Sequence, residues 1–376
     1  MSDSILSHLL GRVPGLDAAV RFQVRQFVAD GQAGQALDLL GATGTAVEGQ
    51  SNSWGVLQVY LLHLTGRYRE ANQVLDGMIG LNLSEQLVMC NCPNEADIMA
   101  RWDADAEGVS ILCTTFNHAR FIDMALAGFF SQVSTHPFEV IVRDDASTDG
   151  TSELLGQWEK RYPRLLKVVR LEENTHSKGQ SPMLATIALA TYPLVAMCEG
   201  DDFWIDSNKL HLQAELLQSH PNWSAVTHNH FELEESTGKL TPGRSTKIRG
   251  VVPKQDLVNV NLVLWCHTLM VRRSLLDMPQ YRNQDGVLGD QVMTAVLGAA
   301  GEVFFIGDLF GSVARRNMFS TYTPLGERDK QRRRINTRRF LAPVLEQRGE
   351  RQAAQRLLRW CKAAEQQLSA AANPQA

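Results

Sequence analysis

Three carboxylates occur within four positions near the middle of the chain, at Glu199, Asp201 and Asp202, and we call them the acidic cluster. They follow an apolar run at residues 194–197, which is typical of a buried strand. In an open α/β sheet, ligands bind at the carboxyl ends of the strands. Carboxylates this close repel one another, and such hard oxygen ligands favour Mn²⁺ or Mg²⁺, which also neutralise a diphosphate. The alternative is a solvated acidic turn in which Asp201 or Asp202 caps the next helix.

Two earlier strands are expected to end at the same edge. Residues 109–116 form a β-rich run that ends at Asn117, and residues 138–143 form another that ends at Asp144 and Asp145. Because the carboxyl ends of parallel strands meet at one edge of a sheet, these residues are expected near the acidic cluster. No glycine-rich phosphate loop follows the first strand, which argues against a dehydrogenase or an NTPase. This set of residues suits a nucleotide whose diphosphate is carried by a metal ion rather than by backbone amides.

Alternating strands and helices must position these residues. Their pattern predicts an α/β fold with a mostly parallel, doubly wound sheet. A polar stretch at residues 232–258, rich in glycine and threonine, is expected to form a loop or lid. Further helices are predicted at residues 121–130, 152–162, 178–190, 208–219 and 289–299, and further strands at 166–171, 225–231, 262–271 and 303–306.

The first hundred residues have a helical pattern of a different kind. Gly31 and the residues after it recur at Gly66, an offset of 35 residues. This resembles the tetratricopeptide repeat, whose helix–turn–helix unit has a period near this value. Such helices offer a concave surface for a protein partner or an acceptor, and the alternative is a cap that only shields the main domain. We predict a helical tetratricopeptide-like domain at residues 1–105, an α/β domain at 106–325 and a C-terminal helical segment at 326–376.

Length, charge and cysteine content restrict the class of protein. The 376 residues suggest two or three domains, and a net charge of −4 gives no reason to expect nucleic acid as a partner. We expect no secretory signal and no transmembrane segment, because neither a basic start nor a long apolar run is present. The six scattered cysteines favour reduced thiols and a cytoplasmic location. Residues 328–339 carry seven basic residues against one acidic, which predicts a solvated helix face, with binding to the inner membrane surface as the alternative.

Two segments, in their order and spacing, resemble the family-2 glycosyltransferases of the A-type nucleotide-sugar transferase fold. The first joins residues 109–117 to the sequence DDASTDGT at 144–151, and the second is EGDDFW at 199–204, which marks a subgroup. The resemblance covers roughly residues 106–320. It implies a metal-dependent, inverting transfer of a sugar from a nucleotide-diphosphate donor, with a UDP-sugar expected, to a hydroxyl of a glycan or protein acceptor.

The resemblance also implies a role for each matching residue at the nucleotide. Thr115, Phe116 and Asn117 would lie by the nucleobase, and Asp144 would accept a hydrogen bond from it. One departure is Thr114, which stands where the family usually has proline. The nucleotide is therefore expected at the ends of the first two strands.

The remaining implied roles concern the metal ion, the diphosphate and the reacting hydroxyl. Asp201 would contact the ribose or the metal ion, and Asp202 would bind the metal ion, Mn²⁺ or Mg²⁺, directly. Arg315 would contact the diphosphate, whereas Asn317 departs from the histidine that the family often has there. Asp290 would be the general base, because the acceptor hydroxyl must lose its proton as the bond forms. An aspartate at a helix start is also a normal cap, and its competitors as base are Asp277, Asp285 and Asp308.

Three other interpretations are weighed against this one. A repeat-bearing scaffold that has lost activity would explain the departures, although the presence of Asp144, Asp202 and Asp290 together argues against it. His228 and His230 alternate along a strand, as metal ligands sometimes do, but such a pair is more often structural. Nucleotidyl transfer on a related sheet would need a glycine-rich loop and a lysine after the first strand, and residues 117–120 supply neither.

Overall fold

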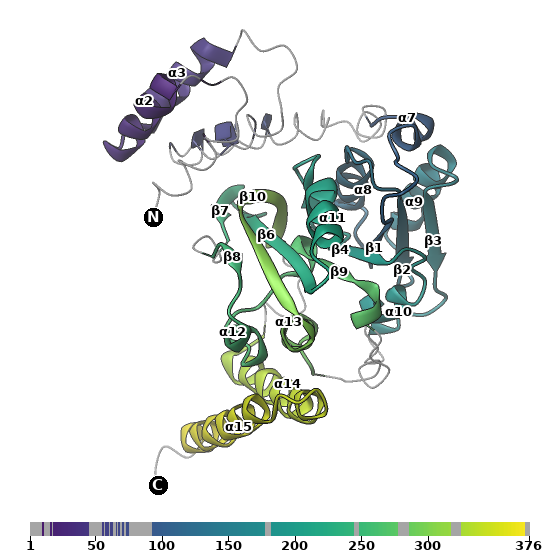
Figure 1. Ribbon diagram of the computed structural model, residues 1–376, viewed down its shortest axis with the longest axis vertical. Coiled ribbons are helices and arrows are strands. Elements are labelled where there is room, and N and C mark those ends of the chain that lie inside the picture. The colour runs from purple at the N-terminus through teal and green to yellow at the C-terminus, as the bar shows by residue number, and fades with distance from the viewer. Residues whose placement is uncertain are drawn as a thin grey trace.

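The computed structural model describes residues 10, 16 and 18–44, single positions between 55 and 74, and then residues 92–176, 182–243, 248–276, 286–316 and 325–372. These residues build a large central sheet with helices on both sides (Figure 1). The α/β class predicted from the sequence is confirmed.

Half of the sheet is parallel. Its strands lie in the order β3-β2-β1-β4 and run in one direction, as the alternating pattern predicts. Ile111 and Cys113 pack into one core and Leu112 into another, so both faces of β1 are buried, as is usual in parallel sheets. The strands are β1 (Val109–Thr115), β2 (Phe138–Asp144), β3 (Leu166–Arg170) and β4 (Leu194–Glu199), and the helices between them are α8 (Ile122–Phe130), α9 (Thr151–Arg161) and α10 (Pro182–Ile187).

The other half of the sheet is mixed, although over the whole sheet more residues pair in parallel than in antiparallel, as predicted. β9 (Met270–Arg272) runs antiparallel to both β4 and β6 (Trp223–Glu234). β10 (Glu302–Arg316) is parallel to β6 but antiparallel to β5 (Phe203–Trp204). β9 and β5 have only three and two residues. Antiparallel neighbours such as these need no crossover helix to reverse the chain.

The strand predicted at residues 262–271 is wrong for most of its length. Only its end joins β9, and Cys266–Thr268 forms a 3₁₀ turn, η2. Side chains take the backbone partners that a strand neighbour would supply: the Trp204 indole donates to the His267 carbonyl at 3.1 Å and the Gln213 amide to the Thr268 carbonyl at 2.9 Å. An apolar run can therefore leave the sheet without unpaired buried carbonyls.

The loop predicted at residues 232–258 is wrong in part. It contains β7 (Lys239–Pro242), which pairs with the end of β6, and β8 (Gly250–Val251), which pairs with β10. A short helix, α12 (Lys254–Val258), follows. The polar composition of this stretch hides two strands that add to the edges of the mixed half.

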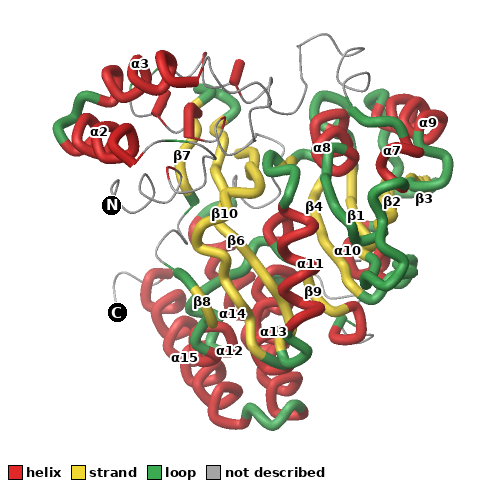
Figure 2. The backbone as a smooth tube through the Cα atoms, turned by 45° about the horizontal axis from the view of Figure 1, so that its top comes forward, coloured by secondary structure: helices red, strands yellow, loops and turns green. Residues whose placement is uncertain are grey.

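The C-terminal helices pack against the helix that carries Asp290. α13 (Gly289–Ala300) and α11 (Lys209–Ser219) form where the sequence predicts them. α14 (Glu327–Gln347) and α15 (Arg351–Ala372) lie side by side (Figure 2). The buried Thr337 hydroxyl of α14 accepts a hydrogen bond from Leu288 N, 2.9 Å away, at the start of α13. The C-terminal segment thus helps to fix the position of α13.

At the N-terminal end, α2 (Ala18–Ala29) and α3 (Ala33–Gly44) form a helical hairpin whose turn holds Gly31 at φ 74° (Figure 1). The second copy of the repeat, at Gly66, lies outside the described residues, so the tetratricopeptide-like domain stays a prediction. Closer to the sheet, α7 (Glu95–Met99) leads into β1. Among the described helices, none combines the length and apolar character needed to cross a bilayer.

Candidate active site

The predicted strand ends do meet at one edge of the sheet. In the strand register Thr115 lies opposite Asp144, and Thr114 lies opposite Glu199. The backbone N–H of Gly200 donates to the Thr114 carbonyl at 2.9 Å, which fixes the acidic cluster against the end of β1. The convergence expected from the sequence is confirmed.

Gly200 is required by close packing in this turn. A Cβ atom at this position would lie 2.8 Å from Thr115 Oγ1 and 3.0 Å from His118 Nδ1. Both of these polar atoms are buried and have no hydrogen-bond partner within the described part of the chain. His118 was missed in the sequence analysis; its position directly after Asn117 was the available signal. Burial lowers the pKa of His118, so the imidazole is neutral at neutral pH although Asp201 is close.

We expect Gly200→Ala to lose donor binding and to destabilise the fold by about 1–3 kcal/mol, because the added methyl group overlaps Thr115 and His118. Gly156→Ala is the matched control, since a Cβ at that α9 position would only touch Arg170 at 3.8 Å. That control should be stabilising by about 0.5–1 kcal/mol, the usual gain from alanine within a helix. Thermal melting and nucleotide binding of both variants check this, and normal binding by Gly200→Ala would contradict it.

The loop after β2 is tied to the loop after β1. Asn117, at φ 56°, accepts a hydrogen bond from Thr148 N at 2.8 Å, and its own N–H donates to Ser147 Oγ at 2.9 Å. Asp144 is 1% exposed and accepts from Ser147 N at 3.0 Å and from the Ser152 hydroxyl. Asp144 therefore shapes this loop, and a contact between it and a nucleobase stays a prediction.

Two further features lie at this edge. Phe116 is 41% exposed at the end of β1, and its contact with a nucleobase stays a prediction. The turn before α9 carries the cap that its DDASTDGT sequence permits: Asp149 Oδ1 accepts a hydrogen bond from the N–H of Thr151, the first helical residue, at 3.1 Å. Gly150 lies between them at φ 99°, a backbone angle that glycine adopts at little cost.

Burial and electrostatic repulsion act together on the acidic cluster. Burial, together with the charges of Asp201 and Glu199, raises the pKa of Asp202 well above its usual range. Burial and the charges of Asp201 and Asp290 raise the pKa of Glu199 to about 8, although solvent reaches part of this side chain. A cation among these carboxylates would relieve the repulsion. The alternative in which Asp201 or Asp202 caps the next helix is wrong, because α11 begins at Lys209 after Asn208.

Arg315 contacts Asp202 through its backbone and not through its guanidinium. Its N–H donates to Asp202 Oδ1 at 2.8 Å. Its guanidinium lies 5.2 Å from the ring centre of Phe121 and 4.6 Å from that of Phe203, and it forms an ion pair with Glu235. The side chain is 7% exposed, so it stabilises the base of the site, and its contact with a diphosphate stays a prediction. Asn317 lies outside the described residues.

Asp290 approaches the acidic cluster from α13. It is the second residue of that helix, the N-cap is Leu288 and no side chain caps the helix, so the interpretation of Asp290 as a cap is wrong. Burial raises its pKa to about 6, and its charge contributes to the shift of Glu199. Of its competitors, Asp277 and Asp285 lie outside the described residues, as does the side chain of Asp308. Asp290 is therefore the candidate base that the structure brings to the acidic cluster.

Three buried histidines beside the site have structural contacts. His267 Nδ1 lies 2.8 Å from the Ser312 hydroxyl, and His228 Nδ1 lies 2.6 Å from the Asn229 carbonyl. The ring of His230 packs edge-on against that of His267, with centroids 4.9 Å apart. Burial lowers the pKa of His267 well below its usual value. These contacts support the structural interpretation of His228 and His230.

The fold is shared with a solved structure. The crystal structure of S. aureus TarS 1-349 in complex with UDP-GlcNAc superposes with a TM-score of 0.51 and 20% sequence identity, over 63% of this chain and 66% of that one. The structure of TarS 1-349 without that ligand gives a TM-score of 0.50 over 67% and 70% of the two chains. The two proteins therefore share their α/β fold.

Sequence comparisons then give the family. Residues 110–278 match the model of glycosyl transferase family 2. The putative teichuronic acid biosynthesis glycosyltransferase TuaG of Bacillus subtilis is 34% identical over 190 residues, 47% of this chain and 68% of TuaG. An uncharacterised protein of Mycobacterium tuberculosis is 36% identical over 120 residues, so the match spans 32% of this chain and about a third (34%) of that relative. The chain belongs to the family-2 glycosyltransferases, which disfavours the scaffold alternative.

Proposed function

We propose that this chain transfers a sugar from a nucleotide-diphosphate donor to an acceptor hydroxyl, with inversion and with the help of a divalent metal ion. The observation that supports it most is the acidic cluster at the carboxyl end of β4, which Asp290 approaches from α13. Several carboxylates lie close together in this site. A ligand that arrives with a bound cation would therefore be favoured there.

The residues present fit Mn²⁺ or Mg²⁺. One carboxylate oxygen of Asp202 accepts a hydrogen bond from the Arg315 N–H, so its other oxygen would bind the metal ion. Asp201 would be a second metal ligand or would contact the ribose. Carboxylate oxygens are the ligands these hard cations prefer. When bound, the ion would neutralise the diphosphate and stabilise it as a leaving group.

The nucleotide is placed at the ends of β1 and β2. The exposed Phe116 offers a ring face to a base, and the Thr115 hydroxyl, which has no partner among the described residues, lies beside Gly200. Uridine is our proposed base, and a UDP-sugar is the first donor to test. The relation to TuaG suggests a surface glycan as acceptor, and a protein is the alternative.

Asp290 takes the proton of the acceptor hydroxyl. With a pKa of about 6 it is ionised at neutral pH, yet it is more basic than an ordinary aspartate. A base is most effective when its pKa lies near the working pH. His118 is neutral and its Nδ1 packs against Gly200, so its role is to position the turn of the acidic cluster.

The direct test is release of UDP from a panel of UDP-sugars by the purified protein, with Mn²⁺ and with EDTA. We expect slow hydrolysis of one or two donors, dependent on metal and accelerated by a matching acceptor. If no UDP-sugar releases UDP but another nucleotide sugar releases its nucleotide, the proposed base is wrong and the proposed reaction stands. Equal release in EDTA would overturn the role of the metal ion.

The N-terminal helices are proposed to hold the acceptor or a partner protein, which a truncated chain tests. The cut belongs before residue 92 and not at the predicted boundary near 105, because the Tyr162 hydroxyl donates to the Pro93 carbonyl at 2.7 Å and Trp102 packs on Phe138. We expect residues 92–376 to fold and to hydrolyse donor at the full-length rate, but to lose transfer to the natural acceptor. Normal transfer by this truncated chain would reduce the helices to a cap.

A further inference from the structure

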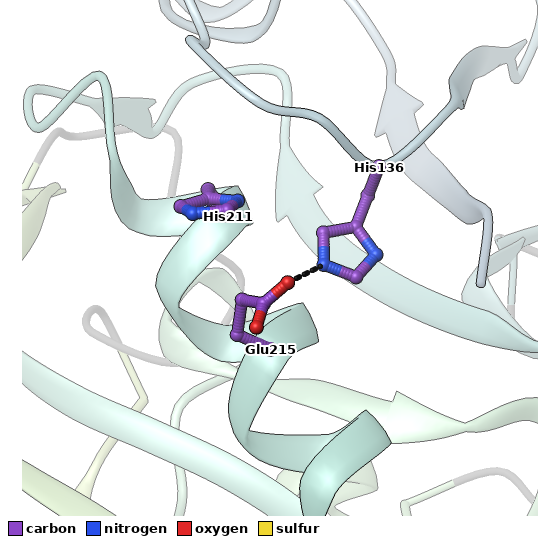
Figure 3. A group of neighbouring side chains, drawn as sticks. All are labelled: His136, His211 and Glu215. Atoms are coloured by element: carbon purple, nitrogen blue, oxygen red, sulfur yellow. Dashed lines mark hydrogen bonds and ion pairs between the residues drawn. The ribbon is translucent and has the colours of Figure 1, made fainter. Parts of the chain in front are cut away.

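Remote from the acidic cluster, three potential metal ligands lie together between α11 and the loop before β2. They are His136, His211 and Glu215, whose ligand atoms all lie within 4.8 Å of one another (Figure 3). His211 and Glu215 are four residues apart on α11 and so share one face of that helix. His136 comes from the loop before β2. In the described part of the chain, no other group of three such residues meets this distance.

The hydrogen bonds of His136 leave one position that needs a positive charge. Its side chain is 0% exposed. Nδ1 lies 2.8 Å from the Glu107 carbonyl oxygen, which can only accept, so Nδ1 carries a proton. Nε2 then presents a lone pair to Glu215 Oε1 at 2.9 Å, as the dashed line in Figure 3 shows. Two acceptors at this distance require a proton, on the imidazole or on the carboxyl group, or a metal ion between them.

We propose that His136, His211 and Glu215 bind a Zn²⁺ ion. Two imidazoles and one carboxylate are a ligand set that zinc accepts, with a water molecule in the fourth position. The hydrogen bond from Nδ1 to the Glu107 carbonyl fixes the tautomer and ring orientation of His136, as second partners of metal-bound histidines do.

The remaining two ligands have room to adjust. Ligand atoms around zinc bind at about 2.0–2.2 Å, so they must come closer together than the present 4.8 Å limit. The Glu215 side chain is 54% exposed and His211 is half-buried, so rotation of both side chains closes this gap while His136 stays in place. The contact between His211 Nδ1 and the Thr135 hydroxyl is long, at 3.5 Å, and costs little to give up.

The position of the site indicates a structural role. Glu107 and His136 precede the amino ends of β1 and β2, whereas the acidic cluster lies at the carboxyl ends of β1 and β4. A bound ion would clamp α11 to the loop before β2. We therefore expect zinc to raise the thermal stability of the protein and to leave turnover with Mn²⁺ or Mg²⁺ nearly unchanged.

The experiment uses the full chain, stripped with a chelator and then held in excess Mg²⁺ so that the acidic cluster is occupied. Titration with Zn²⁺ should give one tight site per chain. The melting temperature should rise by about 3 °C when Zn²⁺ reaches a hundredfold excess over Kd. Co²⁺ in place of zinc should give the visible absorption bands of a four-coordinate site.

Two variants separate zinc binding from a simple ion pair. In Glu215→Gln the amide can still donate to His136 Nε2, so the contact survives while the carboxylate ligand is lost. His211→Ala removes a half-buried ligand whose hydrogen bond to Thr135 is long, at 3.5 Å. Both variants should bind Zn²⁺ at least tenfold more weakly than the wild type. Both should also lose the rise in melting temperature with Zn²⁺ and the Co²⁺ absorption bands. His220→Ala, an exposed histidine at the end of α11, is the control and should keep all three.

Each outcome decides the proposal. Wild-type protein that binds no Zn²⁺ in excess Mg²⁺ would show that His136 and Glu215 form only an imidazolium–carboxylate pair. Zinc binding that Glu215→Gln and His211→Ala leave unchanged would place the ion elsewhere. Neither result would touch the proposed sugar transfer, which depends on the acidic cluster.

Discussion

In Asp290→Asn, kcat should fall by about two orders of magnitude or more, while the binding of donor nucleotide stays as in the wild type. Asparagine has the size of aspartate but cannot accept the proton of the acceptor hydroxyl. Asp290 is not the cap of α13, so the substitution removes no capping hydrogen bond. Steady-state rates with saturating donor and acceptor, beside nucleotide titrations, measure the two effects separately.

The pH dependence adds a second signature of the same residue. Because the base must be ionised, wild-type kcat should rise with pH through about 6 and then level off. The folded-state pKa lies above the unfolded value of about 3.9, so ionisation opposes folding and stability is lost as pH rises from 4 to above 6. Asp290→Asn should therefore melt higher than the wild type at pH 8 and nearly equally at pH 4. If Asp290→Asn turns over at a near-normal rate and its kcat still rises with pH through about 6, Asp290 is not the base.

Asp202→Asn should reduce transfer by about a thousandfold or more, the scale of several kcal/mol of electrostatic stabilisation at a diphosphate. The asparagine oxygen can still accept the Arg315 N–H, so the contact between β10 and the cluster survives. What disappears is the negative charge that would hold the metal ion. Nucleotide binding should consequently lose its dependence on Mn²⁺.

A matched control for this variant is Asp105→Asn, which removes an exposed carboxylate before β1 and should behave as the wild type. The melting temperature of Asp202→Asn should not fall, because the ionised Asp202 is disfavoured where it stands. Undiminished transfer in a well-folded Asp202→Asn protein would remove this residue from the metal site.

The sequence alone was sufficient to predict which strand ends form the edge of the sheet that carries the site. Strand ends at Thr115, Asp144 and Glu199 follow from hydrophobic runs, and parallel pairing brings them together without further information. The start of α13 at Gly289 was also predictable, since its apolar face has a helical period. These features depend on local patterns, which a sequence contains directly.

The features that the sequence did not predict depend on contacts between residues far apart in the chain. Nothing near Arg315 indicates that its guanidinium lies between Phe121 and Phe203, or that Glu235, 80 residues away, neutralises it. The strand predicted at residues 262–271 failed for a similar reason, because indole and amide donors from distant elements replace its sheet partners. The group of His136, His211 and Glu215 likewise exists only after α11 packs against the loop before β2.

The measurement that tests the central claim most directly is the affinity of the wild-type chain for UDP with and without Mn²⁺, compared with that of Asp202→Asn. If the acidic cluster binds a nucleotide diphosphate through a metal ion, Mn²⁺ should tighten UDP binding at least tenfold in the wild type and leave the variant unaffected. Equal affinity for UDP in Mn²⁺ and in EDTA, with full sugar transfer in EDTA, would contradict the proposed metal-dependent reaction.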